Sequence, residues 1–228
     1  MKYIIVGLGY FGSSLSVKLT EMGHEVIGVD FDMAKVNLFK DRVTHTVCID
    51  AKDMQALKTL PLADADVVLV GIGEDFGASV MAVANFKQLQ VKKLIGRAIS
   101  PLHQTVLEAI GVDKIIRPEQ EYAERLARSL EMRGIIDSFD ITEEYNITEA
   151  TVPGRYVGKS VAEANFRRTY NVNVLTVLKQ KETRNLFGKN HVKPTAIGVV
   201  TPETVFEKDD IRVLFGRMTD IDKLLGNG

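Results

Sequence analysis

The chain has 228 residues, 45% of them hydrophobic and 26% charged, which is the composition of a soluble globular protein with one large domain or two smaller ones. Lys and Arg number 29 against 30 acidic residues, so no strong electric field draws the chain to nucleic acid or to an anionic membrane. Cys48 is the only cysteine, which excludes an intrachain disulfide and a cysteine-cluster metal site.

Targeting signals are also missing from the pattern. We expect no signal peptide, because the first predicted strand begins at Tyr3. No apolar run approaches the roughly 20 residues that a membrane helix needs. These features predict a cytoplasmic protein that does not insert into the membrane and contacts it only through a partner.

The first 30 residues predict a strand, a glycine loop, a helix and a second strand. Gly7, Gly9 and Gly12 have the G-x-G-x-x-G spacing of a dinucleotide-binding loop, and Asp30 follows about 20 residues later. Gly7 permits the tight turn, Gly9 lets a phosphate approach the backbone, and Gly12 lets the helix lie close to the sheet. Asp30 is placed to accept hydrogen bonds from ribose hydroxyls, which favours NAD or an adenosine nucleotide over NADP.

Strand-like and helical segments alternate up to residue 117. This alternation predicts a parallel sheet with helices on both faces, a doubly wound Rossmann-like α/β unit of six strands. The expected strands are Tyr3 to Val6, Glu25 to Val29, Thr46 to Ile49, Val67 to Gly71, Lys93 to Arg97 and Lys114 to Ile116. The expected helices after the glycine loop are Asp32 to Phe39, Asp53 to Leu60, Val80 to Leu89 and Pro101 to Ile110.

A further helix is predicted from Glu119 to Arg133, opened by Pro118 and ended by Gly134. Its apolar residues Tyr122, Leu126 and Leu130 are four apart, so they form one stripe. The stripe covers either its own domain or a second copy of the chain, and we favour a crossover or dimer-forming helix over residues 118–137.

The remaining residues, 138–228, predict a smaller α+β domain, with the joint at Asp137 to Asp140. Its expected strands are Asn146 to Val152, Val172 to Leu178, Ile197 to Val200, Thr204 to Phe206 and Ile211 to Phe215. Short helices are expected at Ser160 to Arg167 and at Met218 to Leu225, with a turn at Pro153 and Gly154 and a polar loop from Gln180 to Pro194.

Candidate ligand contacts lie at the carboxyl ends of the strands, where open parallel sheets bind ligands. Asp50 either accepts from an adenine amino group or caps the next turn. Gly71 and Gly73 permit close approach of a ligand, although turns after strands often contain glycine. Arg97 either binds a phosphate or is a solvated arginine. Glu119 either stabilises a helix N-terminus or shares a divalent ion, Mg or Ca, with nucleotide phosphates.

Catalytic patterns are absent from the sequence. No tyrosine has a lysine four residues later, the four histidines lie in no metal-binding frame, and no G-x-S-x-G elbow occurs. A ligand site without reaction machinery indicates a sensor and not an enzyme. The alternatives are an NAD-dependent oxidoreductase with an unrecognised catalytic set and an assembly module whose glycine loop binds no useful ligand.

The order and spacing of several motifs resemble the cytoplasmic RCK (regulator of conductance of potassium) subunits of bacterial Ktr and Trk potassium transporters, and most closely the Ktr type. The motifs are Ile5 to Gly12, Gly23 to Val26 leading to Val29 and Asp30, Ile110 to Ile116 followed by Pro118 and Glu119, Phe166 and Arg167, and Tyr170 to Val174.

This resemblance implies a nucleotide-binding N-terminal domain, a crossover helix and a C-terminal domain, assembled as dimers into an octameric ring beneath a membrane potassium-translocating subunit. The implied ligands are ATP and ADP, or NAD and NADH. By position, Asp30 holds the ribose, the loop from Gly9 through Tyr10 and Phe11 to Gly12 faces phosphates together with Arg97, and Glu119 binds a cation.

The resemblance also implies a second site in the C-terminal domain, where Arg167 and Asn173 match positions that bind cyclic di-AMP in some relatives. Three features depart from the family pattern. Tyr10 stands where ATP-responsive relatives often carry arginine, Lys208 to Asp210 replaces a Gly-Asp turn, and the loop from Gln180 to Thr195 is long. The choice among ATP, ADP and NAD is therefore open.

Overall fold

The computed structural model describes residues 1–131, 134–184 and 190–226. These divide into two compact units, Met1–Glu119 and Gln120–Gly228. No helix in the described ranges is both long enough and apolar enough to cross a membrane.

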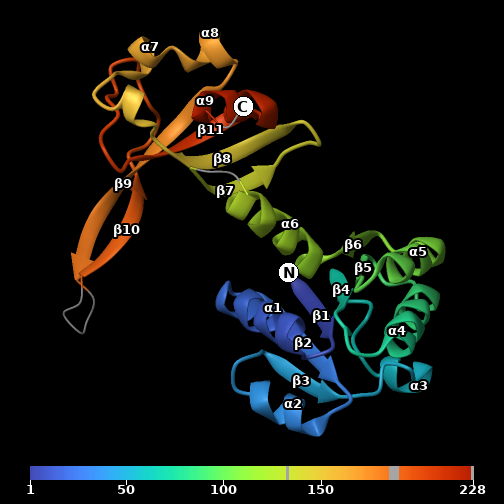
Figure 1. Ribbon diagram of the computed structural model, residues 1–228. Helices are drawn as coiled ribbons and strands as arrows, with labels where there is room; N and C mark the ends of the chain where they lie inside the picture. The colour runs from blue at the N-terminus through green and yellow to red at the C-terminus, as the bar shows by residue number, and fades with distance from the viewer. Residues whose placement is uncertain (132–133, 185–189, 227–228) are drawn as a thin grey trace. The chain divides into compact units, whose positions relative to one another are not determined.

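The N-terminal unit is built on a parallel six-stranded sheet in the order β3-β2-β1-β4-β5-β6, the expected doubly wound arrangement (Figure 1). The strands are β1 (Lys2–Val6), β2 (Glu25–Asp30), β3 (His45–Cys48), β4 (Val67–Val70), β5 (Leu94–Arg97) and β6 (Lys114–Ile116). The helices are α1 (Tyr10–Glu21), α2 (Met33–Phe39), α3 (Met54–Leu57), α4 (Phe76–Gln88) and α5 (Pro101–Ile110).

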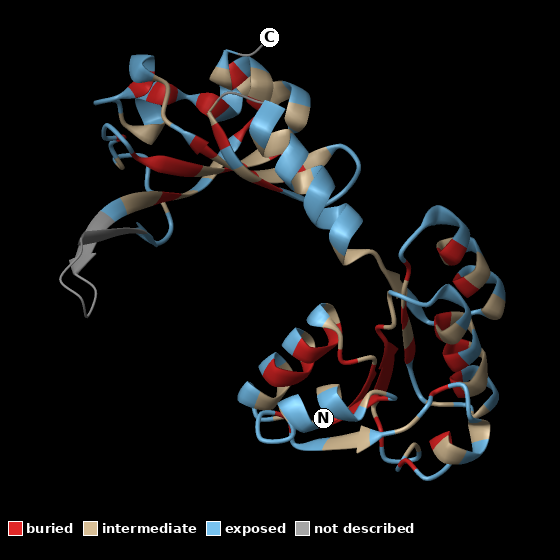
Figure 2. Ribbon diagram, turned by 60° about the horizontal axis from the view of Figure 1, so that its bottom comes forward, coloured by how far each residue is buried: buried red, intermediate tan, exposed pale blue. Residues whose placement is uncertain are grey.

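Both faces are buried at the centre of this sheet, where successive side chains of β1, β2 and β4 point to opposite faces and most of them are buried. Ile4 and Val6 of β1 belong to the core under α3, α4 and α5, whereas Ile5 packs with Val17 of α1. The central strands β1, β2 and β4 accordingly form the buried centre of the unit, while the edge strands β3 and β6 and the outer faces of the helices are partly or fully exposed (Figure 2). This double burial explains why the strands read as continuous apolar runs.

Local signals set most helix boundaries. Asp32 and Asp53 accept backbone N–H groups at the beginnings of α2 and α3, and Gly111 ends α5 in the left-handed conformation with φ 80°. Helix α4 begins at Phe76, four residues before its expected start at Val80, because Asp75 caps it by accepting from Ala78 N at 2.9 Å.

The second unit contains an antiparallel sheet in the order β10-β9-β11-β8-β7. Its elements are β7 (Ile135–Asp140), β8 (Tyr145–Thr151), η1 (Gly154–Tyr156), α7 (Val161–Ala164), α8 (Phe166–Tyr170), β9 (Asn173–Arg184), β10 (Asn190–Ala196), β11 (Ile211–Arg217) and α9 (Met218–Leu225). The expected α+β class and the terminal helix are confirmed.

Helix α6 (Pro118–Glu131) begins in the first unit and continues into the second. The expected end at Arg133 lies outside the described residues. Asp137 to Asp140, where the joint was expected, lie in strand β7. Arg125 and Arg128, three residues apart on α6, form ion pairs with Asp137 and Asp140, which attach the strand to the helix.

Four other expectations for the second unit are corrected. Within the polar stretch from Gln180 to Pro194, the described residues 180–184 and 190–194 pair as parts of the antiparallel strands β9 and β10, since backbone pairing does not require apolar side chains. The helix expected from Ser160 to Arg167 is broken by Asn165, whose φ is 50°. Ile197 to Val200 form no strand, and Gly198 has φ 95° there; Thr204 to Phe206 contribute one isolated bridge, from Val205 to Ser160.

Candidate functional site

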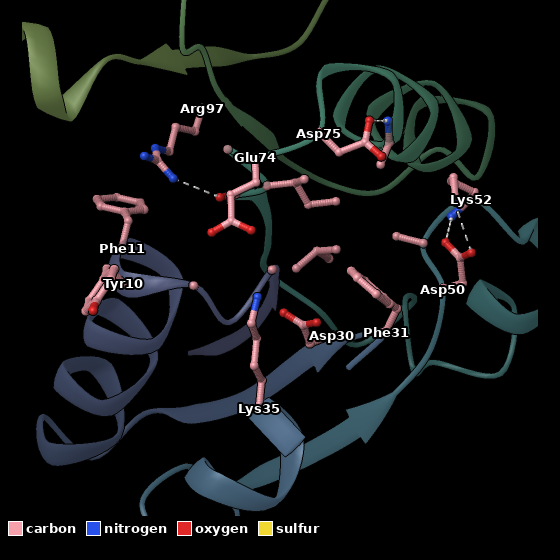
Figure 3. Close-up of a pocket in the computed structure, with 18 of the residues that line it drawn as sticks. Tyr10, Phe11, Asp30, Phe31, Lys35, Asp50, Lys52, Glu74, Asp75 and Arg97 are labelled. Atoms are coloured by element: carbon pink, nitrogen blue, oxygen red, sulfur yellow. Dashed lines mark hydrogen bonds and ion pairs between the residues drawn. The ribbon is translucent and has the colours of Figure 1, made fainter. Parts of the chain in front are cut away.

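A cavity of about 450 Å³ opens at the carboxyl ends of the parallel strands of the N-terminal unit (Figure 3). Strand β1 pairs with β2 on one side and with β4 on the other, so the strand order reverses at this point. Open α/β sheets bind their ligands at such a reversal. All of the predicted nucleotide contacts except Gly12 line the cavity, namely Gly7, Gly9, Tyr10, Phe11, Asp30, Asp50, Gly71, Gly73 and Arg97.

The glycine loop is shaped by two backbone contacts. Gly7 has φ 92°, a conformation that favours glycine, and its N–H donates to Val29 O at 2.7 Å. Gly12 lies so close to Gly7 that a Cβ on Gly12 would be 1.9 Å from Gly7 O. Gly12 therefore does not line the cavity but allows α1 to begin close to the sheet, as its spacing predicted.

Gly9 occupies the N-cap of α1, and among the residues that the structure describes no side chain caps the first turn of that helix. A Cβ built on Gly9 would meet nothing within 4 Å. The first amides of a 12-residue helix therefore face an open approach, which is a favourable place for an anion.

Asp30 is buried at the end of β2, and both of its carboxylate oxygens already hold backbone groups. Oδ2 accepts from Leu8 N at 2.7 Å and Oδ1 accepts from Asp32 N at 2.9 Å. These bonds fix the glycine loop against the start of the next helix. Each carboxylate oxygen has two lone pairs, so capacity remains for a ribose hydroxyl.

Arg97 lies at the end of β5 with three contacts. Its guanidinium forms an ion pair with Glu119, donates from Nη1 to Gly71 O at 3.1 Å, and lies 5.5 Å from the centre of the Phe11 ring. A Cβ on Gly73 would be 2.7 Å from Nη1, so the glycine makes room for the arginine. The sequence predicted separate roles for Arg97 and Glu119, but the structure brings them together.

Asp50 makes the turn contact that the sequence offered as one of its two alternatives. Its Oδ1 accepts from Lys52 N at 3.0 Å, and Oδ2 lies 3.6 Å from Lys52 Nζ. The side chain still lines the cavity, next to the apolar residues Ile49 and Ala51. The turn role is thus present, and contact with an adenine ring stays a prediction.

Sequence reasoning missed several lining residues: Phe31, Lys35, Lys52 and Asp75. Phe31 directly follows Asp30, so its place beside the predicted ribose contact could have been inferred from the sequence. Lys35 lies on α2, where a lysine in an amphipathic pattern is indistinguishable from a solvated one. Its orientation into the cavity is visible only in the folded unit (Figure 3).

Two other predicted sites, the metal site at Glu119 and the ligand site in the second unit, have fewer structural features than the cavity. The described residues contain no group of three or more His, Cys, Asp or Glu side chains that could hold a metal ion. A cation at Glu119 would therefore need oxygens from a ligand. In the second unit, Arg167 on α8 and Asn173 at the start of β9 are both exposed.

Comparison with known proteins assigns the chain to a family. Residues 3–118 match the TrkA-N domain. The chain is 31% identical over 222 residues to the Ktr system potassium uptake protein C of Bacillus subtilis, covering 97% of this chain and 95% of that protein. The chain belongs to the family of Ktr and Trk potassium uptake proteins. The Ktr system potassium uptake protein A of the same organism is 30% identical, with 100% of this chain and 96% of that protein covered.

Solved structures show that this family member has the RCK fold. The RCK domain of GsuK superposes with a TM-score of 0.65 at 18% identity, over 99% of this chain and 47% of that one. A GsuK channel bound to NAD gives the same TM-score and identity, over 98% of this chain and 38% of that chain. The predicted family and fold class are confirmed.

Proposed function

We propose that this Ktr-type protein is a cytoplasmic regulatory subunit that binds an adenine nucleotide and controls a membrane potassium-translocating subunit. The observation that carries the proposal is the cavity at the strand reversal, lined by the glycine loop, Asp30 and Arg97. Its position suits a nucleotide, with the ribose at Asp30 and the phosphates at the first turn of α1. Family membership supplies the partner, since the relatives are named as potassium uptake proteins.

The proposal is one of sensing and not of catalysis. The described lining residues include no His, Cys, Ser or Thr, so neither a histidine base nor a Ser, Thr or Cys nucleophile lines the cavity. A ligand moves a conformational equilibrium only by its different affinities for the two states. Helix α6 carries Glu119 at the cavity and continues into the second unit, so a change at the Arg97–Glu119 pair reaches the element that joins the two units.

The apolar stripe on α6 supports an assembly of several copies. Tyr122, Leu126 and Leu130 are 64%, 45% and 78% exposed, and none of the described residues of α6 is buried. An exposed apolar stripe on a helix favours burial against a partner. We assign residues 118–137 to crossover and dimerisation, and expect dimers that assemble into an octameric ring.

Two further ligands belong to the proposal. A divalent cation, Mg or Ca, fits one carboxylate together with nucleotide phosphate oxygens, and Glu119 would hold it after releasing Arg97. Cyclic di-AMP is the candidate for the exposed pair Arg167 and Asn173 in the second unit. Both side chains carry N–H groups that donate hydrogen bonds to a phosphate or a nucleotide base.

The test is equilibrium binding of ATP, ADP, NAD and NADH by calorimetry, with and without Mg, followed by potassium flux through the membrane subunit at saturating ligand. We expect at least one nucleotide to bind and to change the flux. Asp30→Asn should weaken the binding of that nucleotide, because one carboxylate oxygen that accepts hydrogen bonds is replaced by an amide group that donates them. Asp41→Asn should leave the affinity unchanged, because Asp41 is exposed and lies outside the cavity. Wild-type protein that binds none of the four ligands would overturn the proposal.

A further inference from the structure

The charged residues that line the cavity are unbalanced in number. Three are cationic and five are acidic, a formal sum of −2; they are Lys35, Lys52 and Arg97 against Asp30, Asp50, Glu74, Asp75 and Glu119. A phosphorylated ligand brings further negative charge into this space. The cations that are free to meet it therefore decide how tightly it binds.

Two of the three cations already have carboxylate partners. Lys52 Nζ lies 3.6 Å from Asp50, and Arg97 forms its ion pair with Glu119. Across the described ranges, Lys35 has neither an ion pair nor a hydrogen bond from its ammonium group. Lys35 is thus the cavity cation whose charge is uncommitted.

Lys35 is also well placed to reach a ligand. It is half-buried on α2, and its side chain extends into the cavity beside Asp30 (Figure 3). The carboxylate of Asp30 is engaged by the amides of Leu8 and Asp32, at 2.7 and 2.9 Å, so it is held by the backbone and does not draw the lysine into an ion pair. The ammonium group is left facing the volume next to the predicted ribose position.

We propose that Lys35 binds a phosphate group of the nucleotide and sets the preference of the site for phosphorylated ligands. This inference rests on the proposed nucleotide site and adds to it a specificity residue on α2. An ammonium group with three donors is a strong phosphate ligand when no carboxylate competes. The phosphate belongs to the 5′ chain of the nucleotide, because a 2′-phosphate on the ribose would meet the negative charge of Asp30.

The experiment measures dissociation constants of adenosine, AMP, ADP, ATP, NAD and NADP for wild type, Lys35→Met and Lys40→Met. Lys40 follows α2, is exposed and does not line the cavity, so it controls for the loss of one positive charge near the site. Lys35→Arg keeps the charge and should retain most of the affinity. Melting temperatures of all variants without ligand check that the unit remains folded.

We expect Lys35→Met to weaken the binding of a phosphorylated ligand about tenfold, which is the effect of losing a charge-assisted hydrogen bond. Lys40→Met should weaken the same binding less than about twofold. A loss that grows from AMP to ATP but spares adenosine assigns Lys35 to the 5′ chain. A loss confined to NADP would overturn this placement, because it would put Lys35 at a 2′-phosphate. Equal losses for adenosine and ATP, or no loss in a folded variant, would overturn the inference; wild type that binds none of these ligands would refute the nucleotide site itself.

Discussion

Replacing Gly12 with alanine tests the close packing of α1 on the sheet. The added Cβ would lie 1.9 Å from Gly7 O and 3.1 Å from Gly7 C, both backbone atoms that cannot rotate away. Real Cβ atoms essentially never approach closer than 3.0 Å, so the start of the helix must move by about 1 Å. Overpacking of this kind costs roughly 1 to 3 kcal/mol, and the backbone clash places Gly12 at the upper end.

Helix propensity offsets part of this cost. Alanine is about 1 kcal/mol better than glycine inside a helix, so we expect a net loss of about 2 kcal/mol in the free energy of unfolding. For a unit of this size, about 3 to 6 °C of melting temperature correspond to each kcal/mol, so the N-terminal unit should melt roughly 6 to 12 °C lower. The assay is calorimetric or circular-dichroism unfolding of the nucleotide-free protein.

Gly9→Ala is the matched control. Its Cβ would meet nothing within 4 Å, and Gly9 has φ −66°, which alanine adopts readily. Loss of the glycine cap costs at most about 1 kcal/mol. The variant should stay folded but bind nucleotide more weakly, because the Cβ enters the path of the phosphate. If Gly12→Ala and Gly9→Ala melt at the same temperature, the close-packing argument is wrong.

Three further predictions concern charge, pH and assembly. Arg97→Met should lower the free energy of unfolding by less than about 1 kcal/mol, because its ion-pair partner Glu119 is 61% exposed, yet it should weaken nucleotide binding. A double-mutant cycle with Glu119→Gln measures the coupling energy between the two side chains, and a value above about 2 kcal/mol would contradict this expectation. Burial lowers the pKa of His103 below its ordinary 6.5, and its Nδ1 accepts a hydrogen bond from Ile99 N at 3.4 Å. The folded protein therefore favours the neutral imidazole, so the stability that His103 contributes is full above pH 6.5 and is lost as the pH falls below that value. Urea unfolding at pH 7.5 and 5.5 should show a smaller difference for His103→Gln than for wild type, and equal differences would count against the buried neutral histidine. Leu130→Glu on the exposed stripe of α6 should lower the apparent mass in light scattering, and an unchanged mass would remove α6 from the interface.

The N-terminal unit was predictable because its signals are local. Glycine, aspartate and proline residues mark where strands turn into helices, and the fully buried strands are short apolar runs between them. The cavity position followed from the same pattern, since parallel strands end at one edge. The strand from Val172 to Leu178 was predicted, but its continuation to Arg184 and its pairing with β10 were missed, because that ladder is formed by backbone groups, which the polar sequence does not reveal.

The amino-acid sequence by itself determined the Rossmann-like unit, the glycine loop with Asp30, and the apolar stripe on α6, since each depends on residues close together in the chain. The tertiary structure decided which distant charges meet. Only folding brings Arg97 to Glu119, Asp30 to the amide of Leu8, and Asp137 to Arg125. It also leaves Lys35 unpaired in the cavity. Ion pairing depends on a few ångströms between side chains from different elements, and no local pattern encodes that distance.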